Sequence, residues 1–117
     1  MYEYRVKEIV SIYDGDTMKV VVDLGFGIYT KQTLRLYGIN APEMRGSDKV
    51  NGKITRDWLR GRVYEAVENK TPISIRTKKD KTGKYGRLLA EVFISDEKLS
   101  LNEQMVENGL AIEYMKG

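Results

Sequence analysis

The sequence contains no cysteine and no histidine, and these two absences remove whole classes of chemistry. Without cysteine, the chain has no disulfide framework, no zinc–thiolate site and no thiolate nucleophile. Without histidine, it has no imidazole to act as general base, proton shuttle or metal ligand. Any catalysis by this chain must therefore use carboxylates, arginine, lysine, tyrosine, hydroxyl groups or a hard metal ion.

Long apolar runs are also absent. No segment is apolar over the length needed to span a bilayer, and the first ten residues, MYEYRVKEIV, lack the apolar region of a secretory signal. We therefore expect no membrane insertion. A cytoplasmic or phage-encoded protein is favoured, and a secreted protein whose leader has been removed is also compatible with these absences.

Charge is nearly balanced over the 117 residues, with 20 Lys and Arg against 17 Asp and Glu. The net charge of +3 indicates no particular partner by itself. Its distribution is more informative, because residues 76–87 hold six cations and one acid, whereas residues 91–117 hold two cations and six acids. The basic segment suits a polyanion, although charge alone is equally compatible with a solvated loop.

Hydrophobic periodicity predicts a single domain over residues 1–117 that begins with strands. Met18, Val20, Val22 and Leu24 alternate with Lys19, Val21 and Asp23, which is the period-two pattern of a strand with one buried face. Similar reasoning predicts strands at residues 4–13, 18–24, 28–37, 73–77 and 88–95.

Two helices complete the predicted order β-β-β-α-β-β-α. The longer covers residues 53–69, and its apolar face is expected to contain Ile54, Trp58, Val63, Ala66 and Val67. The shorter begins after a capping box, Ser100 to Glu103, and ends at Gly109. Five strands with a helix after the third predict an all-β core with helices (α+β), a five-stranded Greek-key barrel of the oligonucleotide-binding (OB) type.

Several short segments carry polar groups that are able to take part in catalysis or binding. The turn Asp14-Gly15-Asp16-Thr17 offers two carboxylates and a hydroxyl, although Asp and Gly are also ordinary turn residues. Arg35 alternates with two leucines, so it points away from the predicted core. Glu43 is expected just beyond a strand end, and residues 83–87 are predicted to form a hairpin tip with two cations and a tyrosine. Each segment taken alone has a purely structural interpretation.

In combination and in this order, these segments resemble the staphylococcal nuclease (thermonuclease) family. The matching stretches are DGDT (14–17), LRLYGINAPE (34–43), KYGRLLAEV (84–92) and LNEQMVENGLA (101–111). The resemblance covers nearly the whole chain and implies the family's OB barrel, although the family's C-terminal helix has no counterpart here. It further implies calcium-dependent hydrolysis of phosphodiester bonds in DNA and RNA with little sequence specificity. Single-stranded substrates and 3′-phosphate products are expected.

The resemblance implies a catalytic role for three residues. Arg35 and Arg87 match the two arginines that grip the scissile phosphate. Glu43 matches the glutamate that orders the attacking water and is proposed as the general base. Guanidinium forks suit the negative charge that gathers on the non-bridging oxygens during in-line displacement.

The resemblance also implies one calcium ion. Its ligands match Asp16, the side chain of Asn40 and the backbone carbonyl of Ala41, with Asp14 nearby. Calcium takes oxygen ligands of these kinds and needs no histidine. The family usually has Asp where this chain has Asn40, and because ligand charge tunes affinity, we expect weaker calcium binding here.

Nucleic acid is the expected partner, and the oligomeric state is not indicated. Positions near the bound nucleotide, together with the basic loop, correspond to Lys78, Lys79, Lys81, Lys84, Tyr85 and Tyr114. Two other functions stay open: a catalytically weak or inactive nucleic-acid-binding module on the same barrel, and an interaction domain whose site residues are relics. Retention of Arg35, Glu43 and Arg87 favours the nuclease.

Overall fold

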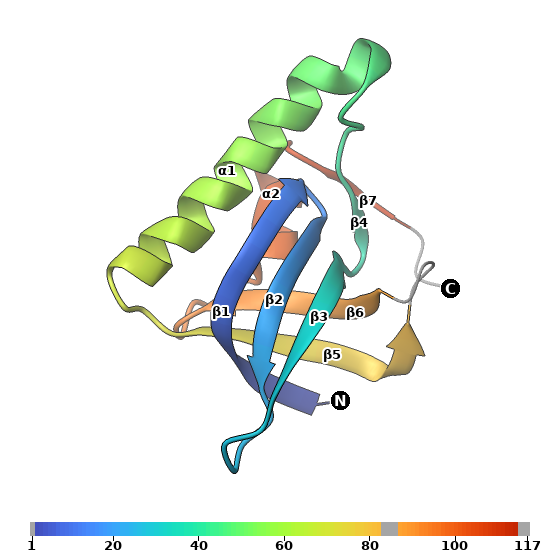
Figure 1. The fold of residues 1–117 in the computed structure, drawn as a ribbon. Helices are drawn as coiled ribbons and strands as arrows, with labels where there is room; N and C mark the ends of the chain where they lie inside the picture. Colours follow the sequence, from blue (N-terminus) through green and yellow to red (C-terminus); the bar gives the residue numbers. More distant parts are fainter. Residues whose placement is uncertain (1, 83–86, 115–117) are drawn as a thin grey trace.

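Five strands form a closed barrel in the order β1-β2-β3-β6-β5, with β5 paired back onto β1 (Figure 1). The computed structural model describes residues 2–82 and 87–114, with the backbone alone for residues 79–82. The strands are β1 Tyr2–Asp14, β2 Thr17–Asp23, β3 Tyr29–Leu36, β5 Ile73–Thr82 and β6 Leu88–Ile94. Only β3 and β6 are parallel neighbours in this barrel. This topology confirms the predicted OB barrel with its helix after the third strand.

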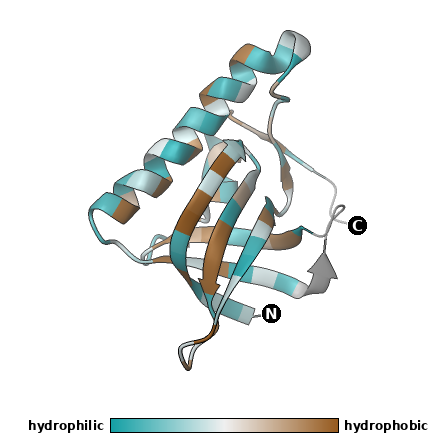
Figure 2. Ribbon diagram, viewed as in Figure 1, coloured by the Kyte–Doolittle hydropathy of each residue, from teal (hydrophilic) through white to brown (hydrophobic). Residues whose placement is uncertain are grey.

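Alternation along the strands fills the barrel. Met18, Val20 and Val22 of β2 are each at most 2% exposed, and Leu34 and Leu36 of β3 are at most 1% exposed. The residues between them are more exposed, so burial alternates along β2 and the end of β3, although β2 is continuously hydrophobic over its three consecutive valines (Figure 2). Consequently Arg35 is carried to the outside of the barrel, as its position between two leucines predicts.

Helix α1, Lys49–Glu68, follows a short 3₁₀ helix, η1, at Gly46–Asp48, and lies beside the ends of β1 and β2 (Figure 1). It begins four residues earlier than predicted. Its predicted apolar face was partly wrong, because Ile54 and Val67 are 52% and 49% exposed. The buried positions are Gly52, Thr55, Leu59, Val63 and Ala66. Small side chains on this face let the helix approach the barrel, and they carry little hydrophobic signal.

Helix α2, Leu101–Glu107, has the predicted capping box, with reciprocal hydrogen bonds between Ser100 and Glu103. Gly109, at φ +71°, ends it as expected. A second, two-stranded sheet was not predicted: β4 (Ile39–Asn40) pairs antiparallel with β7 (Ile112–Glu113). This sheet joins the segment after β3 to the segment after α2. Within the described residues, neither helix has the length and apolar character needed to cross a membrane.

Candidate active site

A cleft of about 720 Å³ opens where the β1–β2 turn meets β3 and the connection from β4 to α1. The segment after α2, which pairs with β4, forms another part of its wall. The predicted site residues that line it are Asp14, Asp16, Arg35, Asn40, Ala41, Glu43 and Arg87. Residues far apart in the chain are therefore gathered at one surface hollow.

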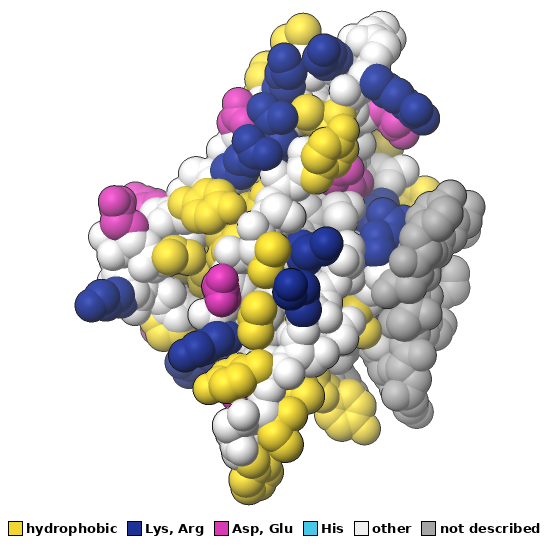
Figure 3. All heavy atoms as spheres, viewed as in Figure 1, with side chains coloured by type: hydrophobic (Ala, Val, Ile, Leu, Met, Phe, Trp, Pro, Cys, Tyr) yellow, Lys and Arg dark blue, Asp and Glu magenta, His cyan; other side chains and the backbone are white. Residues whose placement is uncertain are grey.

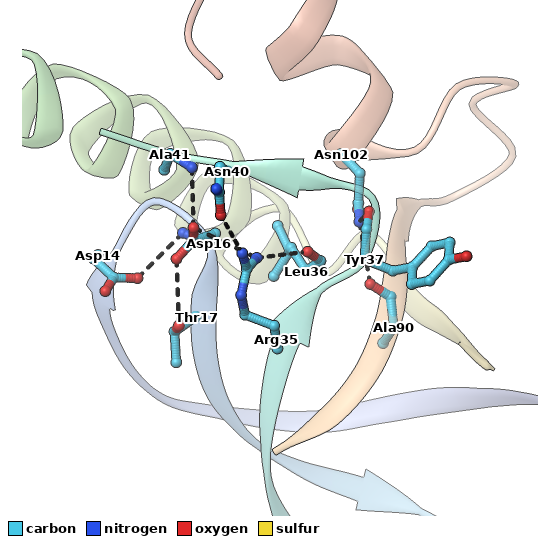
Figure 4. A network of polar contacts seen from close by, with 10 residues as sticks. All are labelled: Asp14, Asp16, Thr17, Arg35, Leu36, Tyr37, Asn40, Ala41, Ala90 and Asn102. Carbon is cyan, nitrogen blue, oxygen red and sulfur yellow. Dashed lines mark hydrogen bonds and ion pairs between the residues drawn. The ribbon is translucent and has the colours of Figure 1, made fainter. Parts of the chain in front are cut away.

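Arg35 lies at the centre of a polar network on one wall of the cleft (Figure 4). Its Nη1 donates to the carbonyl oxygen of Leu36 at 2.8 Å and lies 3.4 Å from Asp16 Oδ2. Its Nη2 donates to Asn40 Oδ1 at 2.5 Å. The side chain is 14% exposed. These contacts hold the planar guanidinium group in one orientation, between a carboxylate and an amide oxygen.

The Asp14–Asp16 turn supplies negative charge to the same network. Asp16 Oδ2 accepts a hydrogen bond from the backbone N–H of Ala41 at 2.9 Å, which links the turn to the segment after β4. The backbone N–H of Asp16 donates to Asp14 Oδ1 at 3.2 Å. Burial, and then the Asp16 carboxylate, raise the pKa of Asp14 from 3.8 to about 6. Asp14 is therefore largely ionised at neutral pH.

The donor atoms of this turn fit a hard divalent cation. Asp16 and Asn40 direct oxygen atoms toward the same guanidinium group, so these oxygens already converge around a positive charge. Carboxylate, amide and carbonyl oxygens are the ligands that calcium takes. Within residues 2–82 and 87–114, however, no three acidic side chains gather closely enough to hold a metal ion. These donor atoms would offer a cation few negative charges, and Arg35 already contacts two of the oxygens.

Glu43 is positioned through its backbone, not through burial of its side chain. The side chain is 65% exposed, and Oε1 lies 3.4 Å from Arg45 Nε. Behind it, the first turn of α1 presents Gly52 to the backbone. A Cβ atom on Gly52 would lie 2.9 Å from the Glu43 carbonyl carbon and 3.1 Å from the Pro42 oxygen. Glycine is thus required here because the helix touches the chain that carries Glu43.

We expect Gly52→Ala to lower the free energy of unfolding by about 1–3 kcal/mol, because the added methyl group must displace backbone atoms. Gly61→Ala is the matched control in the same helix, since a Cβ there meets nothing within 4 Å. That control should be stabilising by about 0.5–1 kcal/mol through helix propensity. Urea unfolding of both variants tests the contact, and equal changes would contradict it.

Two of the predicted nucleic-acid contacts, Lys78 and Tyr114, do not line the cleft. Lys78 Nζ is 3.9 Å from Glu91 Oε1 and 4.5 Å from the ring centroid of Tyr37, and these residues line a separate hollow. Tyr114 is 53% exposed, and its backbone N–H donates to Gly38, beside β4. The roles of these two residues stay predictions.

The remaining nucleic-acid predictions fall on residues that the structure does not describe in full. Lys84 and Tyr85 lie outside the described residues. The side chains of Lys79 and Lys81 do too. The predicted contacts of these four residues stay predictions.

The cleft also contains residues that the sequence interpretation missed. Tyr13 is 72% exposed and directly precedes the Asp14–Asp16 turn. Its position beside that motif is the signal that could have identified it as a cleft residue. Arg45, Asp48 and Asn51 come from the stretch before residue 53, where no helix was predicted. Because η1 and the first turn of α1 form there instead, these side chains are brought to the cleft rim.

Comparison with known proteins agrees with this arrangement. The family model described as staphylococcal nuclease homologue matches residues 33–116, a range that includes Arg35, Asn40, Glu43 and Arg87. The uncharacterized protein MJ1439 of Methanocaldococcus jannaschii is 28% identical over 132 residues, covering 97% of this chain and 61% of that protein. Protein ParB of Escherichia coli is 33% identical over 116 residues, covering 92% of this chain and 56% of that protein. The chain thus spans about three-fifths of the length of these two relatives.

Proposed function

The chain belongs to the staphylococcal nuclease homologue family, and we propose that it is a calcium-dependent nuclease of DNA and RNA. It hydrolyses phosphodiester bonds with little sequence specificity and leaves 3′-phosphate ends. The observation that carries this proposal is the gathering of Asp16, Arg35, Asn40, Glu43 and Arg87 on one cleft. A cleft of about 720 Å³ can admit a phosphodiester together with an adjoining nucleotide.

In this proposal, the two arginines bind the scissile phosphate. Arg35 is held in a fixed orientation by its bond to the Leu36 carbonyl, so little side-chain freedom is lost when an anion binds. Arg87 lies on the same cleft and supplies a second guanidinium group. Both forks stabilise the negative charge that builds on the non-bridging oxygens during displacement.

Glu43 is the proposed acceptor for a proton of the attacking water. Its exposed carboxylate lies at the rim of the cleft, where solvent reaches it directly. Asp16, Asn40 and the Ala41 carbonyl would hold the calcium ion, which when bound screens the phosphate and lowers the cost of forming a hydroxide nucleophile.

Cleavage of heat-denatured DNA and of RNA, with calcium or with chelator, tests this function. We expect cleavage only with calcium, and end-group analysis should show 3′-phosphates and 5′-hydroxyls. Products with 5′-phosphates would contradict the proposed chemistry. Binding without cleavage at millimolar calcium would reject the nuclease and favour a binding module.

Asn40→Asp should lower the half-saturating calcium concentration by about tenfold or more, because it adds a negative charge beside a divalent ion. Asn51→Asp is the matched control, since Asn51 also lines the cleft but is not a proposed ligand. Calcium titration of cleavage and calorimetric titration of binding measure the effect. Equal half-saturation in the wild type and in Asn40→Asp would exclude Asn40 as a ligand.

The second candidate function is a nucleic-acid-binding module without catalysis. The observation in its favour is that Arg35 already occupies oxygens of both Asp16 and Asn40. In such a module, the guanidinium group would permanently take the place of the metal ion. Nucleic-acid affinity would then be independent of calcium, and the cleavage assay separates the two functions.

A further inference from the structure

The N-terminal half of α1 carries a line of cations that begins at the cleft. Figure 3 shows Lys and Arg side chains gathered over this part of the helix. Lys49, Lys53 and Arg56 are spaced four and three residues apart, so they share one helical face and extend about 10 Å along the axis. Arg45, which precedes η1 in extended backbone, is 87% exposed and lines the cleft. We call these four residues the α1 basic stripe.

Two cations of the stripe have no acidic partner within the part of the chain that the structure describes. Arg45 lies near Glu43 and Arg56 near Asp57, whereas Lys49 and Lys53 form no ion pair with any described residue. Both lysines are exposed. Their charges are therefore available to an external anion.

The stripe does not serve the stability of α1. The amino-terminal end of a helix carries partial positive charge and favours acidic side chains. The first turn of α1 has no acidic residue and contains Lys49 instead, and the N-cap Asp48 makes no side-chain capping bond. Cations concentrated at this end of the helix oppose its dipole, and beyond the N-cap Asp48 a bound anion would compensate for that arrangement.

We propose that the α1 basic stripe binds the phosphate backbone of a single-stranded polynucleotide whose scissile bond lies in the cleft. This inference rests on the proposed function and extends it by naming the path of the strand beyond the cleft. Charge complementarity and continuity with the cleft at Arg45 select a polyanion. Exposed Val50 (69%) and Ile54 (52%) directly follow the two lysines, so an unpaired base or sugar finds apolar surface beside the phosphate contacts.

Fluorescence anisotropy of labelled oligothymidines, dT16 and dT3, in chelator tests the stripe without cleavage. The variant is Lys49→Gln/Lys53→Gln. The matched control, Lys7→Gln/Lys98→Gln, removes the same charge at exposed positions that do not line the cleft. At 50 mM salt, each lost phosphate contact should weaken dT16 binding about eightfold, and the slope of log K against log salt should become shallower by about 0.7 per contact. Affinity for dT3 should change less than about twofold, because this oligomer is too short to extend from the cleft along the stripe.

Three results would overturn the proposal that the stripe binds the strand. They are no binding of dT16 by the wild type, a loss of dT16 affinity in the Lys49→Gln/Lys53→Gln variant no larger than in the control, or an equal loss of dT3 affinity in that variant. A larger loss for a 16-base-pair duplex than for dT16 would overturn the assignment to a single strand. Thermal unfolding midpoints at or above that of the wild type would show that the variant remains folded. If the wild type binds dT16 through the stripe but does not cleave it with calcium, strand binding by the stripe is supported and the proposed nuclease activity is rejected.

Discussion

Arg35→Ala is expected to lower kcat/KM for phosphodiester cleavage by about 10²–10³-fold and, at the same time, to tighten calcium binding. The first effect follows from removing a donor aimed at the phosphate. The second follows because the guanidinium group lies 3.4 Å from Asp16 Oδ2 and donates to Asn40 Oδ1, where it opposes a cation at the same oxygens. Single-turnover kinetics and calorimetric calcium titration measure the two effects separately.

The opposite signs distinguish a catalytic role from a structural one. A general collapse of the cleft would weaken cleavage and calcium binding together. Arg62→Ala is a suitable control, because Arg62 also bridges elements of the fold, through Gln104 and Glu97, but does not line the cleft. That variant should lose some stability and keep its kcat/KM. Weaker calcium binding in Arg35→Ala would contradict competition between Arg35 and the metal ion.

Arg35→Lys should rescue little of the lost activity. One ammonium group cannot reproduce the geometry in which a planar fork meets Leu36 O and Asn40 Oδ1 while a face remains for phosphate. If lysine restored most of the rate, charge alone would account for the role of Arg35, and the fixed orientation of its guanidinium group would be irrelevant.

The barrel was predictable from sequence because its strands obey simple local rules. The period-two spacing of Met18, Val20 and Val22 specifies which face is buried, and the same rule orients Arg35 outward. The capping box between Ser100 and Glu103 specifies the start of α2 through local hydrogen bonds. Each of these signals depends on residues within a few positions of one another.

The features of the fold that the sequence did not predict depend on close packing between segments that are distant in the chain. Thr55 is fully buried, and its hydroxyl donates to the Leu110 carbonyl at 2.6 Å, a contact that no hydrophobic pattern indicates. A Cβ on Gly15 would lie 2.5 Å from Thr55 Cγ2, so this glycine is needed for contact with α1 as well as for a turn. The pairing of β4 with β7 involves two residues from each side, too few to leave a period in the sequence.

Asn102 in α2 is a buried polar side chain that hydrogen-bonds to backbone groups of two other segments. It is 2% exposed, and its Oδ1 accepts from the Val92 N–H at 3.1 Å. Its Nδ2 donates to the carbonyl oxygens of Tyr37 at 2.9 Å and Ala90 at 3.1 Å (Figure 4). One amide therefore joins α2 to β6 and to the end of β3, immediately before the segment that carries Asn40.

Asn102→Ala should lower the free energy of unfolding by about 2–5 kcal/mol, because the Val92 N–H and the Tyr37 carbonyl lose a buried partner. Asn108→Ala is the matched control, since the Asn108 side chain makes one exposed bond to the Gln104 carbonyl at the end of the same helix. The control should cost less than about 1 kcal/mol. Urea midpoints with an unchanged m value measure both, and equal losses would mean that the Asn102 bonds add nothing.

Asn102→Asp separates the hydrogen bonds from the shape of the side chain. The introduced carboxylate keeps the acceptor for Val92 but directs negative charge at the carbonyl oxygens of Tyr37 and Ala90, so its pKa in the folded state should be raised above that of the unfolded chain. A raised pKa means that the folded state binds the extra proton more tightly. The destabilisation relative to the wild type should therefore be largest at neutral pH and should shrink as the pH falls through the folded-state pKa, where a protonated carboxyl group can donate to one carbonyl. Urea unfolding of both proteins across this range, at constant ionic strength, tests the direction. A pH-independent difference would show that the two carbonyl oxygens do not depend on the donor that Asn102 provides.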